Sequence, residues 1–156
     1  MTYVFDNSPL SSLFKNFYRG RFPSLWERFD QLVADGRLTS TREVKREIDA
    51  SSIALMRDWA DANTPIFTTP THAEGAAVVQ IYKVEHFQQN IEKQKLLRGG
   101  VLADPFVIAK AMSANLTVVT MELFKPNAAK IPNICKHFDV ACMTLEEFME
   151  AEGWEF

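Results

Sequence analysis

Short apolar segments alternate along this chain with segments that begin like helices, and this alternation constrains the fold more than any other feature. Tyr3–Phe5 and Thr117–Thr120 are apolar or β-branched runs of the kind found in buried strands. Ser8-Pro9 and Asp104-Pro105 each place a capping residue before a proline, as at the start of a helix. Uniformly apolar strands separated by helices favour a parallel sheet with helices on both faces. The sequence therefore predicts one domain over residues 1–156, with a three-layer α/β/α fold around a central parallel sheet.

The segments between these landmarks predict further helices. A second helix is expected from Pro23 to just before Gly36, and a third is expected from Arg42 onward. A bend in the third helix around residues 49–52 stays open. Residues 83–98 are polar with few apolar positions, and their pattern does not divide into elements. The residues expected on the inner side of the third helix are Val44, Ile48, Leu55 and Trp59.

Composition excludes several classes of protein. Seventeen Lys and Arg against 20 Asp and Glu give a net charge of −3. We therefore expect no strong non-specific binding of nucleic acid, although this net charge is compatible with a local basic patch. Two cysteines, Cys135 and Cys142, are too few for a disulfide scaffold. No apolar run is long enough to span a membrane, and the first residues lack the pattern of a signal peptide. We therefore expect a soluble cytoplasmic protein.

Carboxylates stand where the predicted strands end. In open α/β sheets the ligand site lies outside the carboxyl ends of the strands. Asp6, either Glu43 or Glu47, and Glu122 are the acids at these places. Asp104 joins them because it heads the helix that leads into the strand Thr117–Thr120. Carboxylates about 5 Å apart repel by roughly 3 kcal/mol per adjacent pair at an effective dielectric of about 20. A bound Mg²⁺ or Mn²⁺ would compensate that repulsion and could activate water against a phosphodiester.

Each acid also has a simpler interpretation when it is taken alone. Asp6 and Asp104 precede or join proline-containing helix starts, where turn formation or capping would explain them. Glu43 and Glu47 could lie on a solvated helix face, and Glu122 could be an ordinary loop residue.

Four segments carry a resemblance to a known family. Tyr-Val-Phe-Asp6-Asn-Ser8 resembles the opening strand of PIN-domain proteins, the class of the VapC-type toxin ribonucleases. Val44-Lys-Arg-Glu47-Ile and Asp104-Pro-Phe-Val-Ile-Ala resemble the family's second and third acidic motifs. Thr120-Met-Glu122-Leu-Phe resembles the fourth, with Glu122 where the family usually has Asp. The tail resembles an uncharacterised PIN-like branch.

This resemblance implies a metal-dependent endoribonuclease, the toxin of a toxin–antitoxin pair. It implies that Asp6, Glu47, Asp104 and Glu122 are catalytic and hold one or two Mg²⁺ or Mn²⁺ ions. The residues expected to support them are Ser8, Thr120, Glu43 and Asn127. An antitoxin protein is the expected partner beside the RNA substrate, covering the acidic pocket or an apolar groove, and a homodimer would be usual for the family. The candidate phosphate contacts are Arg19, Arg21, Arg98, Lys125 and Lys130.

Two other interpretations of the sequence stay open. The chain could be a catalytically weak PIN-like module that binds RNA or protein. It could also be a small-molecule phosphatase with Asp6 as nucleophile, although the second aspartate expected at position 8 is Ser8.

Overall fold

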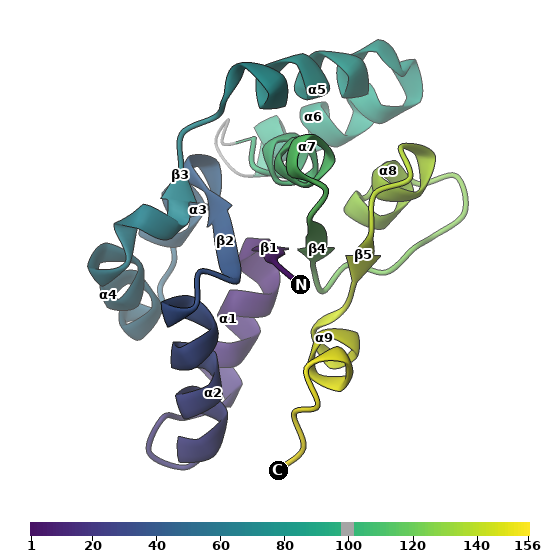
Figure 1. The fold of residues 1–156 in the computed structure, drawn as a ribbon. Helices are drawn as coiled ribbons and strands as arrows, with labels where there is room; N and C mark the ends of the chain where they lie inside the picture. The colour runs from purple at the N-terminus through teal and green to yellow at the C-terminus, as the bar shows by residue number, and fades with distance from the viewer. Residues whose placement is uncertain (98–101) are drawn as a thin grey trace.

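The computed structural model describes residues 1–97 and 102–156 (Figure 1). Five strands within these residues form one parallel sheet in the order β3-β2-β1-β4-β5. In register, Tyr3 faces Leu38 on one side and Thr117 on the other. The strands are β1 (Tyr3–Phe5), β2 (Leu38–Thr41), β3 (Phe67–Thr68), β4 (Thr117–Val119) and β5 (Cys142–Met143).

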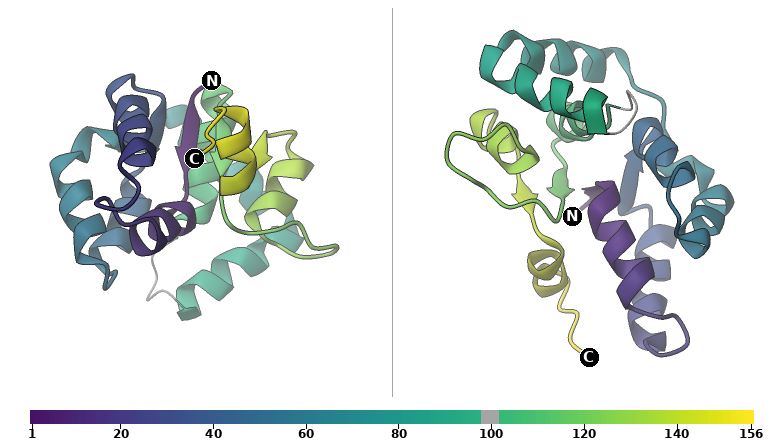
Figure 2. Two further views of the ribbon diagram at one scale, coloured as in Figure 1. Left: turned by 90° about the horizontal axis from the view of Figure 1, so that it is seen from below. Right: turned by 180° about the vertical axis from the view of Figure 1, so that it is seen from behind.

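Helices cover both faces of this sheet (Figure 2). On one face, Tyr3 and Phe5 project toward Phe148 of α9, with ring centroids 4.8 and 5.1 Å apart. On the other face α7 packs against β1, β2 and β4, with α5 and α8 at its sides. The helices are α1 (Asn7–Asn16), α2 (Pro23–Ala34), α3 (Arg42–Asp49), α4 (Ala54–Ala62), α5 (His72–Lys83), α6 (Gln88–Leu97), α7 (Asp104–Ala114), α8 (Ile131–His137) and α9 (Leu145–Ala151).

This arrangement confirms the predicted α/β/α fold with a central parallel sheet. Local signals fix several boundaries. The Thr41 hydroxyl accepts the Val44 N–H at 3.2 Å and so caps α3, and Asn115 ends α7 in the left-handed region at φ 54°. None of the helices within the described residues combines the length and apolar character that a membrane span requires.

Three local expectations were wrong. Leu55, expected on the inner side of the helix that begins at Arg42, is 66% exposed, because the chain breaks between α3 and α4, next to the bend left open at residues 49–52. The helix α1 begins at Asn7, so Asp6 and not Ser8 occupies the capping position. Asp104 is itself the first residue of α7, and Ala103 occupies the capping position there.

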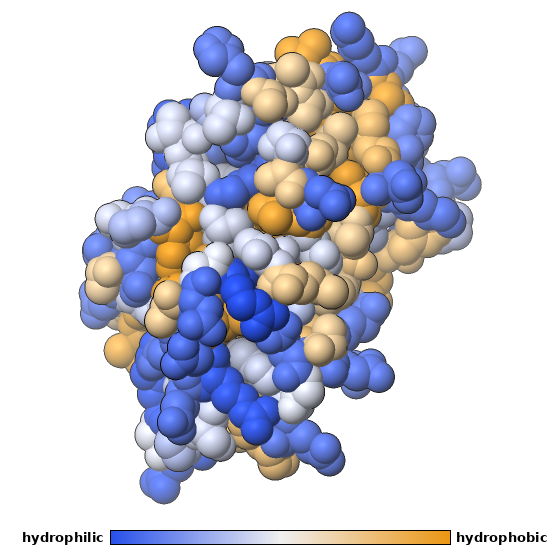
Figure 3. All heavy atoms as spheres, viewed as in Figure 1, coloured by the Kyte–Doolittle hydropathy of each residue, from blue (hydrophilic) through white to orange (hydrophobic). Residues whose placement is uncertain are grey.

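The helix α2 has an exposed polar side and a buried apolar side. Figure 3 shows hydrophilic side chains over the lower part of the face seen in Figure 1, where α2 lies. The exposed positions of α2 include Glu27, Arg28 and Asp30, whereas Trp26 and Phe29 are buried against α1 and α4. The amphipathic pattern of α2 therefore places its charge in solvent and its rings in the core.

Candidate active site

Asp6 is the centre of a hydrogen-bonded group at the carboxyl ends of β1 and β4. Its Oδ2 accepts the Ser8 hydroxyl and the Thr120 hydroxyl, each at 3.1 Å. The same two hydroxyl oxygens accept backbone N–H groups from the loop after β4, from Met121 at 3.1 Å and from Glu122 at 3.2 Å. Each hydroxyl is thereby oriented with its proton toward Asp6, which fixes the carboxylate.

The Asp6 carboxyl carries a strongly shifted pKa. Its side chain is 3% exposed, and its pKa is raised from the ordinary 3.8 to about 7, with burial as the largest cause. This net value includes the raising effects of the Asp104 and Glu122 charges and the lowering effects of the Asn7 N–H and the Ser8 hydroxyl. These contributions indicate that the charges of Asp104 and Glu122 lie close enough to act on the Asp6 carboxylate.

Asp104 does not cap α7, although its sequence context suggests a cap. It is the first residue of α7, after Ala103 at the capping position. Its Oδ2 accepts the Nδ2 of Asn90 at 3.0 Å. Within residues 1–97 and 102–156, Oδ1 of Asp104 and Oδ1 of Asp6 are buried and have no hydrogen-bond partner. Capping therefore does not explain either aspartate.

Glu43 and Glu47 both lie on the buried side of α3. They are 4% and 9% exposed, so neither occupies an ordinary solvated helix face. Arg42 pairs with Glu43, with Nη2 3.2 Å from Oε1. The helix α3 follows β2, which pairs with β1, and this places both glutamates near the sheet edge that carries Asp6. Glu47 as a metal ligand stays a prediction.

Glu122 and Asn127 belong to the loop between β4 and α8. Glu122 Oε2 accepts the Ile131 N–H at 2.9 Å, so this carboxylate also anchors the start of α8. Asn127 is exposed at a turn and has φ 63°, a conformation that asparagine tolerates better than most residues. The turn explains why an asparagine stands at this position. The expected support of the acidic site by Asn127 stays a prediction.

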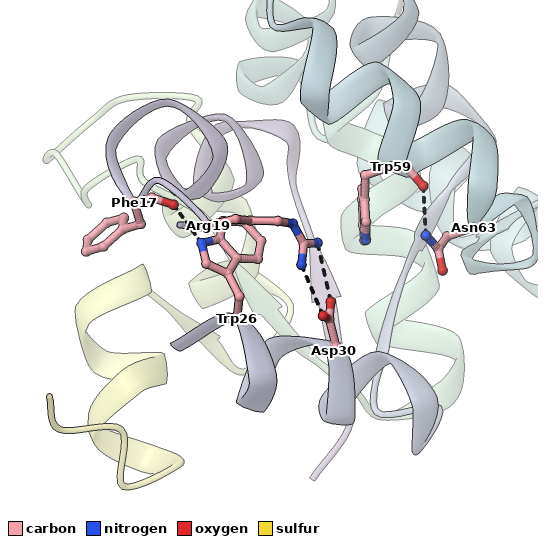
Figure 4. Close-up of polar contacts among 6 residues, drawn as sticks. All are labelled: Phe17, Arg19, Trp26, Asp30, Trp59 and Asn63. Carbon is pink, nitrogen blue, oxygen red and sulfur yellow. Dashed lines mark hydrogen bonds and ion pairs between the residues drawn. The ribbon is translucent and has the colours of Figure 1, made fainter. Parts of the chain in front are cut away.

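The predicted RNA-contacting cations fall into two groups. Arg19 and Arg21 follow the end of α1, and the ten residues of that helix span about 15 Å away from Asp6. Figure 4 shows Arg19 paired with Asp30, at 3.0 Å, and its guanidinium lies 4.3 Å from the ring of Trp26. Lys125 and Lys130 lie on the loop that carries Glu122, and the prediction for Arg98 falls outside the described residues.

A separate apolar pocket of about 530 Å³ lies between the α1–α2 turn and α4. Trp26 and Trp59 stand on its two sides in Figure 4. The Trp26 indole donates to the Phe17 carbonyl at 2.6 Å, and Asn63 donates to the Trp59 carbonyl at 2.8 Å. Exposed Leu55 also lines this pocket. Arg19 thus belongs to an aromatic pocket rather than to the group around Asp6.

The acidic group suits a hard divalent cation in its chemistry. Its donors are carboxylate oxygens, which Mg²⁺ and Mn²⁺ prefer, and two of these oxygens are buried without hydrogen bonds. In the described part of the chain, no three His, Cys, Asp or Glu side chains already form a group that could hold a metal ion. Asp6 and Asp104 would therefore form the protein's core contribution, completed by further oxygen ligands.

Sequence comparison assigns the chain to a family. The family model described as domain of unknown function DUF4411 matches residues 3–156. This chain belongs to the DUF4411 family. No curated protein matches this DUF4411 chain. Its structure is similar to a chain in the crystal structure of VapBC2 from Rickettsia felis bound to a DNA fragment from their promoter. The two chains share 11% sequence identity and align with a TM-score of 0.46 over 92% of this chain and 98% of that chain.

Asn90 lies at the acidic group but was not among the predicted site residues. Asn90 of α6 is buried and its amide contacts the Asp104 carboxylate. It lies in residues 83–98, whose pattern did not divide into elements, so no sequence signal placed it beside a strand end. A buried polar residue in a helix is visible only after the helix is located.

Proposed function

We propose that this protein is a metal-dependent endoribonuclease that hydrolyses RNA phosphodiesters. The observation that carries the proposal is the pair of buried aspartates, Asp6 and Asp104, which repel each other and each keep one oxygen without a hydrogen bond among the described residues. Core packing gains nothing from such a pair, because buried like charges are costly unless a cation or proton compensates them. The resemblance of the four acidic motifs to PIN-domain nucleases supports the same chemistry.

Each residue of the group has a role in this proposal. Asp6, Glu47, Asp104 and Glu122 would hold Mg²⁺ or Mn²⁺, directly or through water. The bound ion would supply Lewis acidity, lowering the pKa of a water and neutralising phosphate charge. Ser8 and Thr120 hold the Asp6 carboxylate in one orientation through their hydroxyls.

The loop after β4 would contact the RNA strand. Phe124 is 49% exposed and Lys125 is exposed, and both follow Glu122 closely. Aromatic rings stack with unpaired bases and lysines neutralise phosphates, which together hold single strands without strong sequence preference. Lys130 at the end of this loop would add a second phosphate contact.

Cleavage of an RNA panel tests the proposal. Wild type with Mn²⁺ or Mg²⁺ is expected to cleave, and Asp104→Asn is expected to lose at least about 100-fold in rate because the site loses a ligand charge. Asp35→Asn makes the same chemical change on the exposed end of α2 and is expected to cleave like wild type. Equal cleavage by all three proteins would point to a contaminating nuclease and refute the proposed site.

The expected antitoxin partner fits the pocket between α1, α2 and α4. We propose that a partner segment inserts a bulky apolar side chain between Trp26 and Trp59. Leu55→Lys is expected to abolish capture of the partner while the free protein keeps its RNA cleavage. Val79→Lys is the matched control, because Val79 is 51% exposed on α5 and outside this pocket. Loss of capture in both variants would refute this assignment.

One observation favours the alternative of a catalytically weak module. Glu122, the acid that departs from the family pattern, already accepts the Ile131 N–H and stabilises α8. A structural use of this carboxylate would leave fewer ligands for a cation. RNA binding by wild type without cleavage in Mn²⁺ or Mg²⁺ would establish this alternative in place of the nuclease.

A further inference from the structure

We propose that Asn90 is a positioning residue of the acidic site, aiming Asp104 and securing the loop that follows β4. This inference rests on the proposed metal site. Asn90 belongs to α6, which lies beside α7 in Figure 1, and its side chain is 8% exposed. It is thus a buried polar residue at the acidic group that none of the acidic motifs includes.

The hydrogen bonds of Asn90 fix its orientation. Its Nδ2 donates to Asp104 Oδ2 and to the Ala129 carbonyl, both at 3.0 Å. A backbone carbonyl can only accept, so the atom that faces Ala129 must be the nitrogen. Both protons of the amide are therefore used, one on the carboxylate and one on the loop.

The bond to Asp104 leaves a defined atom for the site. Because Oδ2 is occupied by Asn90, Asp104 presents Oδ1, which is buried and has no hydrogen bond within the described residues. A carboxylate held by one oxygen cannot rotate freely, so the other oxygen keeps one direction. Hydrogen bonds of this kind orient metal ligands and typically account for about 10- to 100-fold in metal affinity.

The second bond joins two parts of the site. Ala129 lies between Glu122 and α8, so Asn90 holds the loop of Glu122 and the helix start of Asp104 with one side chain. Oδ1 of Asn90 is also buried without a hydrogen bond in the described part of the chain. An unpaired buried amide oxygen costs free energy, and Oδ1 of Asn133 shares this property, so the two hydrogen bonds of Nδ2 and not the oxygen distinguish Asn90.

Asn133, in the first turn of α8, provides a matched control at the end of the same loop. It is also 8% exposed, and its Nδ2 donates to the Lys125 carbonyl at 2.6 Å. It supports the loop as Asn90 does, but its hydrogen bond goes to a backbone carbonyl and not to an acid. Replacement of each by alanine therefore separates loop support from the orientation of Asp104.

Calorimetric titration with Mn²⁺ on the folded proteins tests the inference. Asn90→Ala is expected to weaken Mn²⁺ binding by about tenfold or more, and Asn133→Ala by less than about threefold. Where Asn90→Ala does not fold, Asn90→Ser replaces it, since a hydroxyl retains one donor, and about a threefold or greater loss is expected. Wild-type affinity in the folded Asn90 variant, or equal loss in both alanine variants, overturns the role of Asn90 alone. Absence of Mn²⁺ binding by wild type overturns the metal site and this inference together.

Discussion

Replacement of Asp6 by asparagine should stabilise the metal-free protein above neutral pH. The pKa of Asp6 is raised in the folded state to about 7 from the ordinary 3.8, first by burial and then by the charge of Asp104. A raised pKa means that the folded state prefers the protonated carboxyl. Its contribution to stability is therefore complete below about pH 4 and is lost as pH rises through about 7. The side-chain amide of the Asp6→Asn variant would carry no charge at any of these pH values.

The magnitude follows from the two pKa values. Their difference of about 3 corresponds to about 4 kcal/mol, at about 1.4 kcal/mol for each pKa unit. We therefore expect the Asp6→Asn protein to be more stable by about 2–4 kcal/mol at pH 8, with the full difference as the upper bound. For a domain of this length that is roughly 4–16 °C in melting temperature.

Thermal unfolding in EDTA at pH 5 and pH 8 measures this effect. Wild type should lose stability over this range, and Asp6→Asn should lose much less. Asp35→Asn, the same change at an exposed position, should follow wild type at both pH values. A variant that is less stable than wild type at pH 8, or a wild type with no loss of stability between the two pH values, would refute the reasoning about buried charge.

Three further predictions concern other parts of the molecule. Lys110→Met should cost about 2–4 kcal/mol in urea unfolding, because the ammonium of Lys110 donates three hydrogen bonds to β2 and β3, one of them to the carbonyl of buried Ser40. A cost below about 0.5 kcal/mol would contradict this. Glu152→Gln should lower the free energy of unfolding by about 1 kcal/mol at pH 7 and by less at pH 3. Burial raises the pKa of Glu152, but the hydrogen bonds from Arg37 and Tyr3 outweigh burial and lower the net pKa, so the stabilisation is lost as pH falls through that pKa. An equal cost at both pH values would show that the charge of Glu152 does not contribute. Phe124→Ala should weaken the binding of a single-stranded RNA by about 5- to 100-fold in fluorescence anisotropy, because its exposed ring can stack on a base, and Mn²⁺ affinity should stay unchanged. Unchanged RNA affinity would exclude base stacking on this ring.

The sheet and most helix starts could be predicted because their signals are local. β1 and β4 are apolar runs that need no knowledge of their neighbours, and the capping box at Thr71 pairs it with Glu74, only three positions along the chain. Leu55 was misplaced because the break between α3 and α4 depends on how two short helices pack against α1. That packing is tertiary, and an apolar residue at helical spacing does not reveal it.

The candidate site could be predicted in part for the same reason. The strand-end rule found Asp6 and Thr120, which the structure joins by a hydrogen bond, and it drew attention to Asp104. It could not tell whether Asp104 caps a helix or presents a buried oxygen to a site, since an aspartate before a proline fits both. The difference lies in Asn90, 14 residues earlier, whose contact with Asp104 depends on where the fold places α6.

The hydrogen-bond pattern at Asp6 explains why hydroxyl residues accompany the acids. A carboxylate with both oxygens occupied by hydrogen-bond donors would have no oxygen left for a cation. Ser8 and Thr120 both donate to the same oxygen, Oδ2, and this leaves Oδ1 for another ligand. Asn90 does the same at Asp104 by occupying Oδ2 alone. At both aspartates, neutral donors bind one oxygen and leave the other available, which is the arrangement that a carboxylate needs to be held in place and still bind a cation.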